Sequence, residues 1–175
     1  EAAAFLQSND KVMFLFVGDG AERDHLIARS REMGLNNVQF IASQPREKVP
    51  AIWSICDLAL VHLRNSEVFS EVIPSKIFEA MAMGLPILLV TPQGIASDIV
   101  ISTHAGLWLP PEQPEKLASM AAALSGKKRL LTRLGENGEG ASGRFSRRRQ
   151  AEEMLQVLEI AAAGWGSRVG LDSAT

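Results

Sequence analysis

The residues whose types and spacing best suit chemistry lie in SEVIPSKIFEAMAMGLPILLV, residues 70–90. Pro74 favours the first position of a helix, because the N–H that proline lacks would have no partner there. We expect this helix to run to Met83 and to be stopped by Gly84 and Pro86. Its first turn would expose unpaired backbone amides at the positive end of the helix dipole. The stretch therefore predicts a helix start that can bind an anion such as phosphate.

Four side chains around this helix start could extend such a site. Lys76 adds a positive charge and Ser75 adds a hydroxyl group, and both suit a phosphate. Glu79 lies one turn further along, on the face of Ser75, where its carboxylate could accept two hydrogen bonds from a ribose diol. Glu71 precedes the helix and could contact whatever the phosphates carry. A structural interpretation is equally open: Lys76 and Glu79 could form a surface ion pair, and Glu71 could be a solvated loop acid.

Short apolar runs alternate with helical patterns along most of the chain. The strands and helices that these patterns predict must position the start of the helix at Pro74. Strands apolar on both faces and separated by helices predict a parallel sheet covered on both sides, in a doubly wound, Rossmann-like α/β domain. Ligands of such sheets bind beyond the carboxyl ends of the strands. We expect strands at 12–17, 37–42, 57–63, 86–91 and 106–110, helices at 21–34, 46–56 and 94–102, helical structure from Pro114 onward, and a glycine-rich loop followed by a basic run at 135–150.

The segment after the first expected strand carries Gly18, Asp19 and Gly20. Glycines at a strand-to-helix turn let a ligand approach the backbone closely. Only two of the three glycines of a dinucleotide fingerprint are present, so an ordinary turn explains the segment about as well.

Composition limits the classes of function. The 175 residues suffice for one domain with a core, and a net charge of −2 gives no general case for nucleic-acid binding. The single cysteine excludes a disulfide framework. Glycines and prolines interrupt the uncharged window at 80–97, so we expect no membrane span there. No residues have metal-ligand spacing, and His62 stands alone at the end of an expected strand.

The stretch EVIPSKIFEAMAMGLP, with Glu71 and Glu79 at its two glutamate positions, resembles the signature of GT-B glycosyltransferases of family 4, also called group 1. The resemblance extends upstream through FLFVGDGAERDHL and downstream to FSRRRQAEEML, and covers roughly residues 1–163. The sequence PSKIFEAMAMG is most similar to that of family members that build bacterial cell-envelope polysaccharides.

The resemblance implies that residues 1–165 form the nucleotide-sugar-binding half of a GT-B enzyme, followed by a disordered tail at 166–175. The other half, an N-terminal acceptor domain, would precede Glu1, so the chain alone should bind a donor without turning it over. The implied activity is retaining transfer of a hexosyl or N-acetylhexosaminyl group from a nucleoside diphosphate sugar, most simply UDP-linked, to an envelope polysaccharide or a lipid-linked acceptor. No cofactor or metal is implied, and the location would be cytoplasmic, at the inner face of the membrane.

The resemblance also implies residue roles. Glu79 would hold the ribose, Ser75 and Lys76 the diphosphate, and Glu71 the donor sugar, with Glu71 and Lys76 as the catalytic pair. Gly18 and Gly20 would lie under the phosphates with Asp19 in the same donor site, Ser43 beside the base, and Arg64 near the phosphates. The sequence departs from the signature around Glu71, which stands in FSEVIPSK instead of Glu-Gly-Phe-Gly, and the family's basic residue on an earlier loop would precede Glu1.

Four further expectations concern alternatives and partners. An enzyme similar to nucleotide-sugar epimerases would need additional carboxylates and a histidine in the cleft. A non-catalytic α/β interaction module would leave both glutamates without a role. The basic residues at 127–129 and 144–149 favour a solvated face, or else peripheral contact with anionic lipid, and the apolar pattern at 151–165 favours a helix that packs on the body or on the absent domain.

Overall fold

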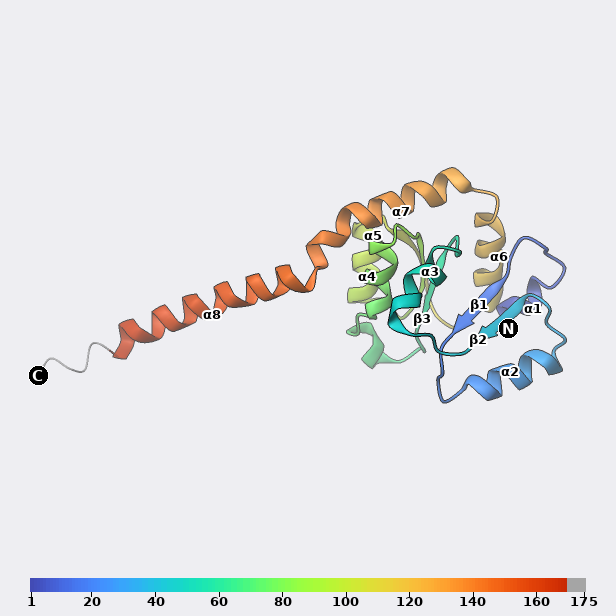
Figure 1. Ribbon diagram of the computed structural model, residues 1–175, viewed down its shortest axis with the longest axis horizontal. Helices are drawn as coiled ribbons and strands as arrows, with labels where there is room; N and C mark the ends of the chain where they lie inside the picture. The colour runs from blue at the N-terminus through green and yellow to red at the C-terminus, as the bar shows by residue number, and fades with distance from the viewer. Residues whose placement is uncertain (170–175) are drawn as a thin grey trace, which may run out of the picture.

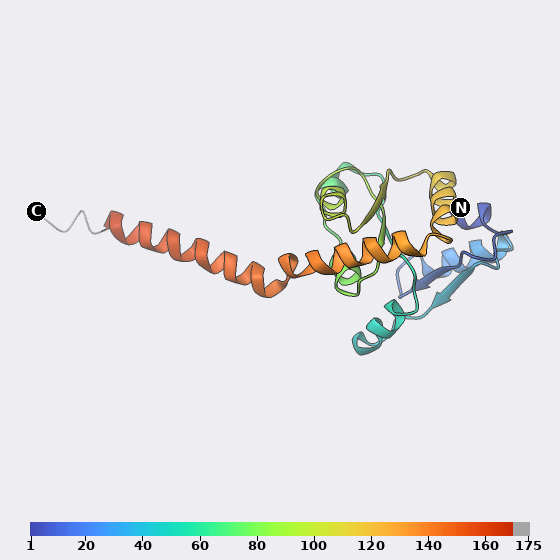
Figure 2. The same cartoon turned by 90° about the horizontal axis from the view of Figure 1, so that it is seen from above.

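The computed structural model describes the backbone of residues 1–169 and the side chains of residues 1–162 (Figure 1). Five short strands alternate with helices, and the last helix extends away from the rest (Figures 1 and 2). The strands are β1 (Phe14–Val17), β2 (Val38–Ile41), β3 (Ala59–His62), β4 (Ile87–Val90) and β5 (Gly106–Leu109). The α-helices are α1 (Ala2–Phe5), α2 (Arg23–Glu32), α3 (Val49–Trp53), α4 (Ser75–Ala82), α5 (Ile95–Ser102), α6 (Pro114–Leu124), α7 (Lys128–Ser142) and α8 (Arg147–Val169), and the 3-10 turns are η1 (Arg46–Lys48), η2 (Glu67–Ser70) and η3 (Gly143–Phe145).

All strand pairs are parallel, which confirms the predicted α/β class. The strands form two hydrogen-bonded sheets, β1-β2 and β3-β4-β5, where we expected one. In the second sheet Val61 is aligned with Leu89, and Leu89 with Trp108. Every connection between adjacent strands contains a helix, as a parallel pair requires.

Strand β4 is buried on both faces, which explains its uninterrupted apolar sequence. Ile87 and Leu89 pack in a cluster with residues of α4, α5 and α7, whereas Leu88 and Val90 pack in another cluster with residues of α6. The three-stranded sheet is therefore covered on both sides, as a doubly wound fold requires.

Helix α6 connects the two sheets. Leu117 packs in the cluster beneath β4 and also in a smaller cluster with α1 and Phe14 of β1. The first sheet is less covered: α2 buries none of its residues, and Phe16 remains 44% exposed although it stacks on Phe40 at 5.2 Å between ring centroids. The sheet β3-β4-β5 with α4, α5 and α7 thus holds the larger share of the buried core.

The predicted glycine-rich loop was wrong, because residues 128–142 form helix α7. A β-carbon on Gly135 would overlap the carbonyl oxygen of Gly84 and lie 3.0 Å from its carbonyl carbon, and one on Gly138 would lie 3.3 Å from the β-carbon of Ala105. The glycines let α7 approach the end of α4 and the start of β5 closely. Their cost in helix propensity is offset by this packing.

Helix α8 continues through residues 166–169, which we had assigned to a tail, whereas residues 170–175 lie outside the described part. The side chains of residues 147–162, the part of α8 for which side chains are described, are all exposed, so this part does not pack on the body. Five of its large apolar side chains are 55% to 74% exposed: Met154, Leu155, Val157, Leu158 and Ile160. Among the described residues, no helix combines the length and the apolar character needed to cross a membrane.

The glycines of α7 allow a matched stability test. Replacing Gly135 by Ala should lower the free energy of unfolding by about 1–3 kcal/mol, because the added methyl group overlaps the backbone of Gly84. Replacing Gly140 by Ala should leave it unchanged or raise it by up to about 1 kcal/mol, because the new β-carbon enters open space in the same helix. Urea unfolding of both variants measures the difference, and equal effects would contradict the close packing of α7.

Candidate functional site

Helix α4 begins at Ser75, one residue later than the sequence predicts, and Pro74 is its N-cap, with φ −64° and ψ 130°. Proline still suits this place, since its ring fixes φ at a value that both the extended N-cap and the helix accept, and it contributes no unpaired N–H. No side chain caps the helix start. The amides of Ser75 and Lys76 therefore have no capping partner and face the exposed end of the helix.

The polar and apolar residues of α4 lie on opposite sides. Ile77 and Met81 have no exposed surface and pack in the cluster with β3 and β4, whereas Ser75, Lys76 and Glu79 are exposed. Burial of one face orients the helix, and this orientation presents the other face to solvent.

Ser75 donates a hydrogen bond to Glu79, with 3.1 Å between Oγ and Oε1. This contact confirms that the two residues share a face. The alternative of an ion pair between Lys76 and Glu79 does not form, and Lys76 has no ion-pair partner among the described residues. The helix start thus combines uncapped amides, an unpaired ammonium group, a hydroxyl group and a carboxylate.

The loops after β1 and β2 are joined by Asp19. Its carboxylate accepts a hydrogen bond from the backbone N–H of Ser43 at 3.1 Å, and Nε of Arg23 lies 3.4 Å from its other oxygen. The structure therefore brings two predicted site residues together, and the Asp19 carboxylate, which stays 57% exposed, holds the loop at Ser43. Sequence reasoning missed Arg23, and its spacing of four residues from Asp19 gave no helical signal, because Asp19 precedes α2.

Glycines keep the turn after β1 open. Gly18 has φ 143°, a region that favours glycine, and its N–H donates to the carbonyl of Ile41 at 3.1 Å. A β-carbon on Gly18 or Gly20 would meet no atom within 4 Å. The backbone of this turn is therefore accessible.

Glu71 and Arg64 lie on exposed loops, and neither forms an ion pair with another described residue. Glu71 directly follows η2. Next to Arg64, the side chain of Asn65 donates to Glu112 at 3.2 Å, which links the loop after β3 to the loop after β5. Glu112 has φ 60°, an uncommon value for a residue other than glycine, and the sequence gave no sign of this contact.

His62 is the last residue of β3, so it lies at the edge of the sheet formed by the carboxyl ends of the strands. Partial burial lowers its pKa below the ordinary value for histidine, because desolvation disfavours the charged ring. Among the described residues, no group of three or more His, Cys, Asp or Glu side chains could hold a metal ion.

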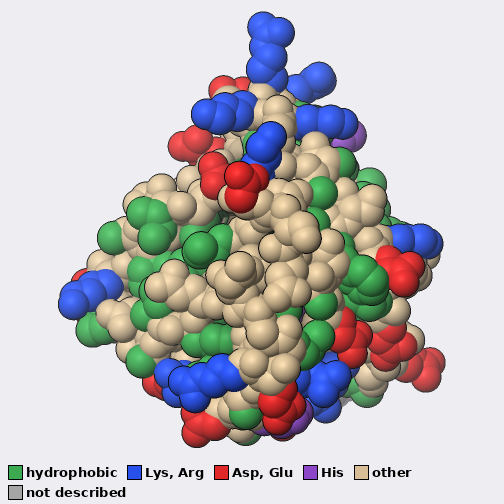
Figure 3. All heavy atoms as spheres, turned by 90° about the vertical axis from the view of Figure 1, so that its right-hand side faces the viewer, with side chains coloured by type: hydrophobic (Ala, Val, Ile, Leu, Met, Phe, Trp, Pro, Cys, Tyr) green, Lys and Arg blue, Asp and Glu red, His purple; other side chains and the backbone are tan. Residues whose placement is uncertain are grey.

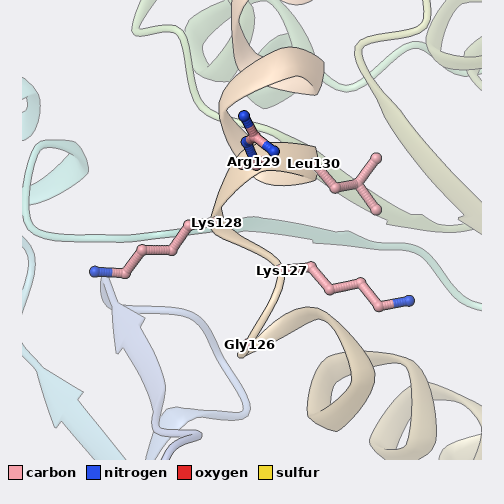
Figure 4. A pocket seen from close by; sticks show the side chains of 5 residues that line it. All are labelled: Gly126, Lys127, Lys128, Arg129 and Leu130. Atoms are coloured by element: carbon pink, nitrogen blue, oxygen red, sulfur yellow. The ribbon is translucent and has the colours of Figure 1, made fainter.

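The basic residues outside the site do not converge. Gly126, Lys127, Lys128, Arg129 and Leu130 line a hollow of about 470 Å³ at the turn between α6 and α7, and Lys127 and Lys128 point away from one another there (Figure 4). On α8, Arg148 pairs with Glu152 and Arg149 with Glu153, each at 2.9 Å. Figure 3 shows basic side chains mainly at the top and bottom edges of one face, with acidic ones beside them. These observations favour a solvated face.

Known proteins are similar to this chain in sequence, and solved structures share its fold. Residues 1–141 match the profile of the family described as glycosyl transferases group 1. The probable glycosyltransferase WbjE of Pseudomonas aeruginosa is 32% identical over 120 residues, which cover 68% of this chain and 30% of WbjE. Anabaena HepE, solved in complex with UDP-glucose, matches with a TM-score of 0.74 at 20% identity, over 90% of this chain and 43% of HepE.

A third match concerns a single domain. The C-terminal domain of LpcC, a glycosyl transferase group 1 protein from Francisella tularensis, has a TM-score of 0.64 at 17% identity, over 83% of this chain and 76% of that domain. The chain thus spans less than half the length of WbjE and of HepE, but most of the separate C-terminal domain. Because the family profile covers 141 of its 175 residues, the chain belongs to the glycosyl transferases group 1 family.

Proposed function

We propose that this chain is the donor-binding half of a retaining glycosyltransferase that takes its sugar from a UDP-sugar. The observation that carries the proposal is the uncapped start of α4, where Ser75, Lys76 and Glu79 are exposed together while the opposite face of the helix is buried. Amides and an ammonium group suit a diphosphate, and a carboxylate one turn away suits a ribose. The complex of HepE with UDP-glucose supports the choice of uridine.

In the proposed reaction, the bond between the anomeric carbon of the sugar and the β-phosphate oxygen breaks, and the acceptor oxygen forms a new bond to that carbon on the same face. The acceptor proton passes to the departing phosphate. Negative charge develops on the diphosphate, so groups already oriented toward it accelerate the step. The amides of α4 and Lys76 supply this stabilisation, and Glu71 approaches the sugar. The transferred group is a hexose or an N-acetylhexosamine.

The acceptor would bind outside this chain, in the remaining part of a longer enzyme. WbjE and HepE are both more than twice as long as the region that matches. An envelope polysaccharide or a lipid-linked glycan is the proposed acceptor, and the name of WaaG, a structural neighbour described as involved in lipopolysaccharide biosynthesis, is compatible with it. In this proposal the enzyme acts at the inner face of the cytoplasmic membrane, and its reaction needs no cofactor or metal.

Lys76 offers the most direct test of phosphate binding. Lys76→Met should weaken UDP binding about tenfold, because one charge-assisted contact is lost. It should leave the binding of uridine nearly unchanged, and the loss should shrink at high salt. Isothermal titration of the chain measures these affinities. Lys128→Met is the matched control, since Lys128 is also an exposed lysine in the first turn of a helix. The absence of UDP and GDP binding by the unmodified chain at millimolar nucleotide would overturn the proposed function.

Glu79 tests ribose binding. Glu79→Gln should weaken UDP and uridine by a similar factor, about ten- to a hundredfold, since hydrogen bonds to a charged acceptor contribute about 1.5–3 kcal/mol. Glu115→Gln, an exposed glutamate in the first turn of α6, is the control. A Glu79→Gln variant that binds uridine as well as the unmodified chain does would show that the ribose lies elsewhere.

Turnover tests the division into two halves. The chain should bind UDP-glucose or UDP-N-acetylglucosamine without releasing UDP, because the acceptor half is needed to complete the site. An assay of UDP release with and without simple sugar acceptors measures this. Sustained release at a rate typical of an enzyme, about 1 per second or faster, would contradict this division.

A further inference from the structure

We propose that Gly94 is a positioning residue, whose missing side chain lets the backbone at Ser70 pack against it and so holds Glu71 beside the start of α4. The inference rests on the proposed function, because it gives Glu71 a role at the donor sugar. Gly94 precedes α5 in the loop after β4, and Ser70 ends η2 in the loop after β3. Two loops from neighbouring strands therefore meet at the edge of the sheet where α4 begins.

The contact between the loops leaves no room for a side chain. A β-carbon on Gly94 would overlap the carbonyl oxygen of Ser70 and would lie 2.7 Å from its carbonyl carbon and 2.9 Å from its α-carbon. All three atoms belong to backbone, which cannot move aside as the end of a flexible side chain can. The carbonyl group in this contact belongs to the peptide bond that joins Ser70 to Glu71. Displacing it therefore displaces the backbone of Glu71.

Space, and not backbone conformation, makes glycine necessary at this position. Gly94 has φ 166°, an extended value that any residue can adopt. An alanine could take the same φ and ψ, so its methyl group would point at the Ser70 carbonyl. The clash that this substitution creates is relieved only if one of the two loops moves.

Gly94 is the less movable partner. Ser97 accepts a hydrogen bond from the N–H of Gly94 at 2.9 Å and donates one to its carbonyl oxygen at 2.7 Å. Ser97 has no exposed surface, and the adjacent Ala96 packs in the cluster with β4. The end of β4 is held too, since Trp108 donates from Nε1 to the carbonyl of Thr91 at 2.9 Å.

The loop on the Ser70 side has fewer anchors. From Ser66 to Ser70 its described hydrogen bonds are local: Phe69 N–H donates to the Ser66 carbonyl at 2.9 Å, and the Ser70 hydroxyl donates to the Glu67 carbonyl at 2.7 Å. The longer-range bond of this loop, from Asn65 to Glu112, lies before η2. Val68, Val72 and Ile73 in the same segment are 71%, 37% and 39% exposed. A side chain at position 94 would therefore move the loop that carries Glu71 and leave α5 in place.

The start of α4 should not follow this movement, because Ile77 and Met81 fix the helix in the core. Substitution of Gly94 should then disturb contacts with the donor sugar while sparing contacts with the nucleotide. This separation distinguishes a positioning role from a general loss of stability, which would weaken both.

The experiment compares UDP with UDP-glucose and UDP-N-acetylglucosamine, titrated into the 175-residue chain. For Gly94→Ala, the ratio of the Kd for UDP to the Kd for the preferred UDP-sugar should change about tenfold, the effect of one charge-assisted hydrogen bond, with UDP itself changed less than about twofold. Gly140→Ala is the matched control, because its β-carbon meets no atom within 4 Å, and it should keep the original ratio. Adding Gly94→Ala to Glu71→Ala should cause no further change in the ratio, since both act through one carboxylate.

The outcomes separate the two proposals. An unmodified chain that binds neither UDP nor a UDP-sugar overturns the proposed function. If the unmodified chain binds them, two results overturn the positioning role alone. One is a Kd ratio for Gly94→Ala equal to that for Gly140→Ala, and the other is independent effects of Gly94→Ala and Glu71→Ala in the double variant. If circular dichroism shows that Gly94→Ala does not fold, Ser97→Ala decides. Ser97→Ala removes both hydrogen bonds that hold Gly94 and adds no bulk, so it should change the Kd ratio in the same direction as Gly94→Ala. An unchanged Kd ratio overturns the proposal.

Discussion

The burial of one face of α4 against β3 and β4 is the interaction on which the candidate site depends. Ile77, Ala80 and Met81 have no exposed surface, and they pack on strands that are themselves covered on both sides. This packing fixes the helix axis and its rotation. The same rotation brings Ser75 and Glu79 to the surface, where they share a hydrogen bond. The polar end of the helix is thus positioned by apolar contacts on its other side, and not by its own weak surface interactions.

Close contacts between backbones form a second layer of constraint. At Gly94, Gly106 and Gly135, an added β-carbon would overlap a carbonyl oxygen of another segment. These contacts join the loop after β4 to the loop after β3, the start of β5 to β4, and α7 to the end of α4. Glycine therefore serves here mainly to let segments approach one another. Because each contact is with backbone atoms, which cannot turn aside as the end of a side chain can, an added methyl group displaces a whole segment.

The exposed setting of the site has an electrostatic consequence. Lys76, Ser75 and Glu79 are in contact with water, so each interaction with a ligand is partly screened. Under the proposed function, the rest of a longer enzyme would close over the helix start, lower the local dielectric and strengthen the same contacts. The chain itself spans less than half of WbjE and of HepE. Modest affinity in the chain by itself is the physical expectation for an open site.

The sequence by itself determined the elements whose signals are local. The apolar run at 86–91 predicted β4, and the spacing of Ser75 and Glu79 placed both residues on one face of α4. The tertiary structure alone decided that the glycine-rich residues 135–142 continue helix α7, that the strands separate into two sheets, that Asp19 holds the loop at Ser43, and that Gly94 meets Ser70. Periodicity reports how a segment buries its own side chains, whereas these four features depend on which distant backbone comes within contact. No pattern within a single segment contains that information.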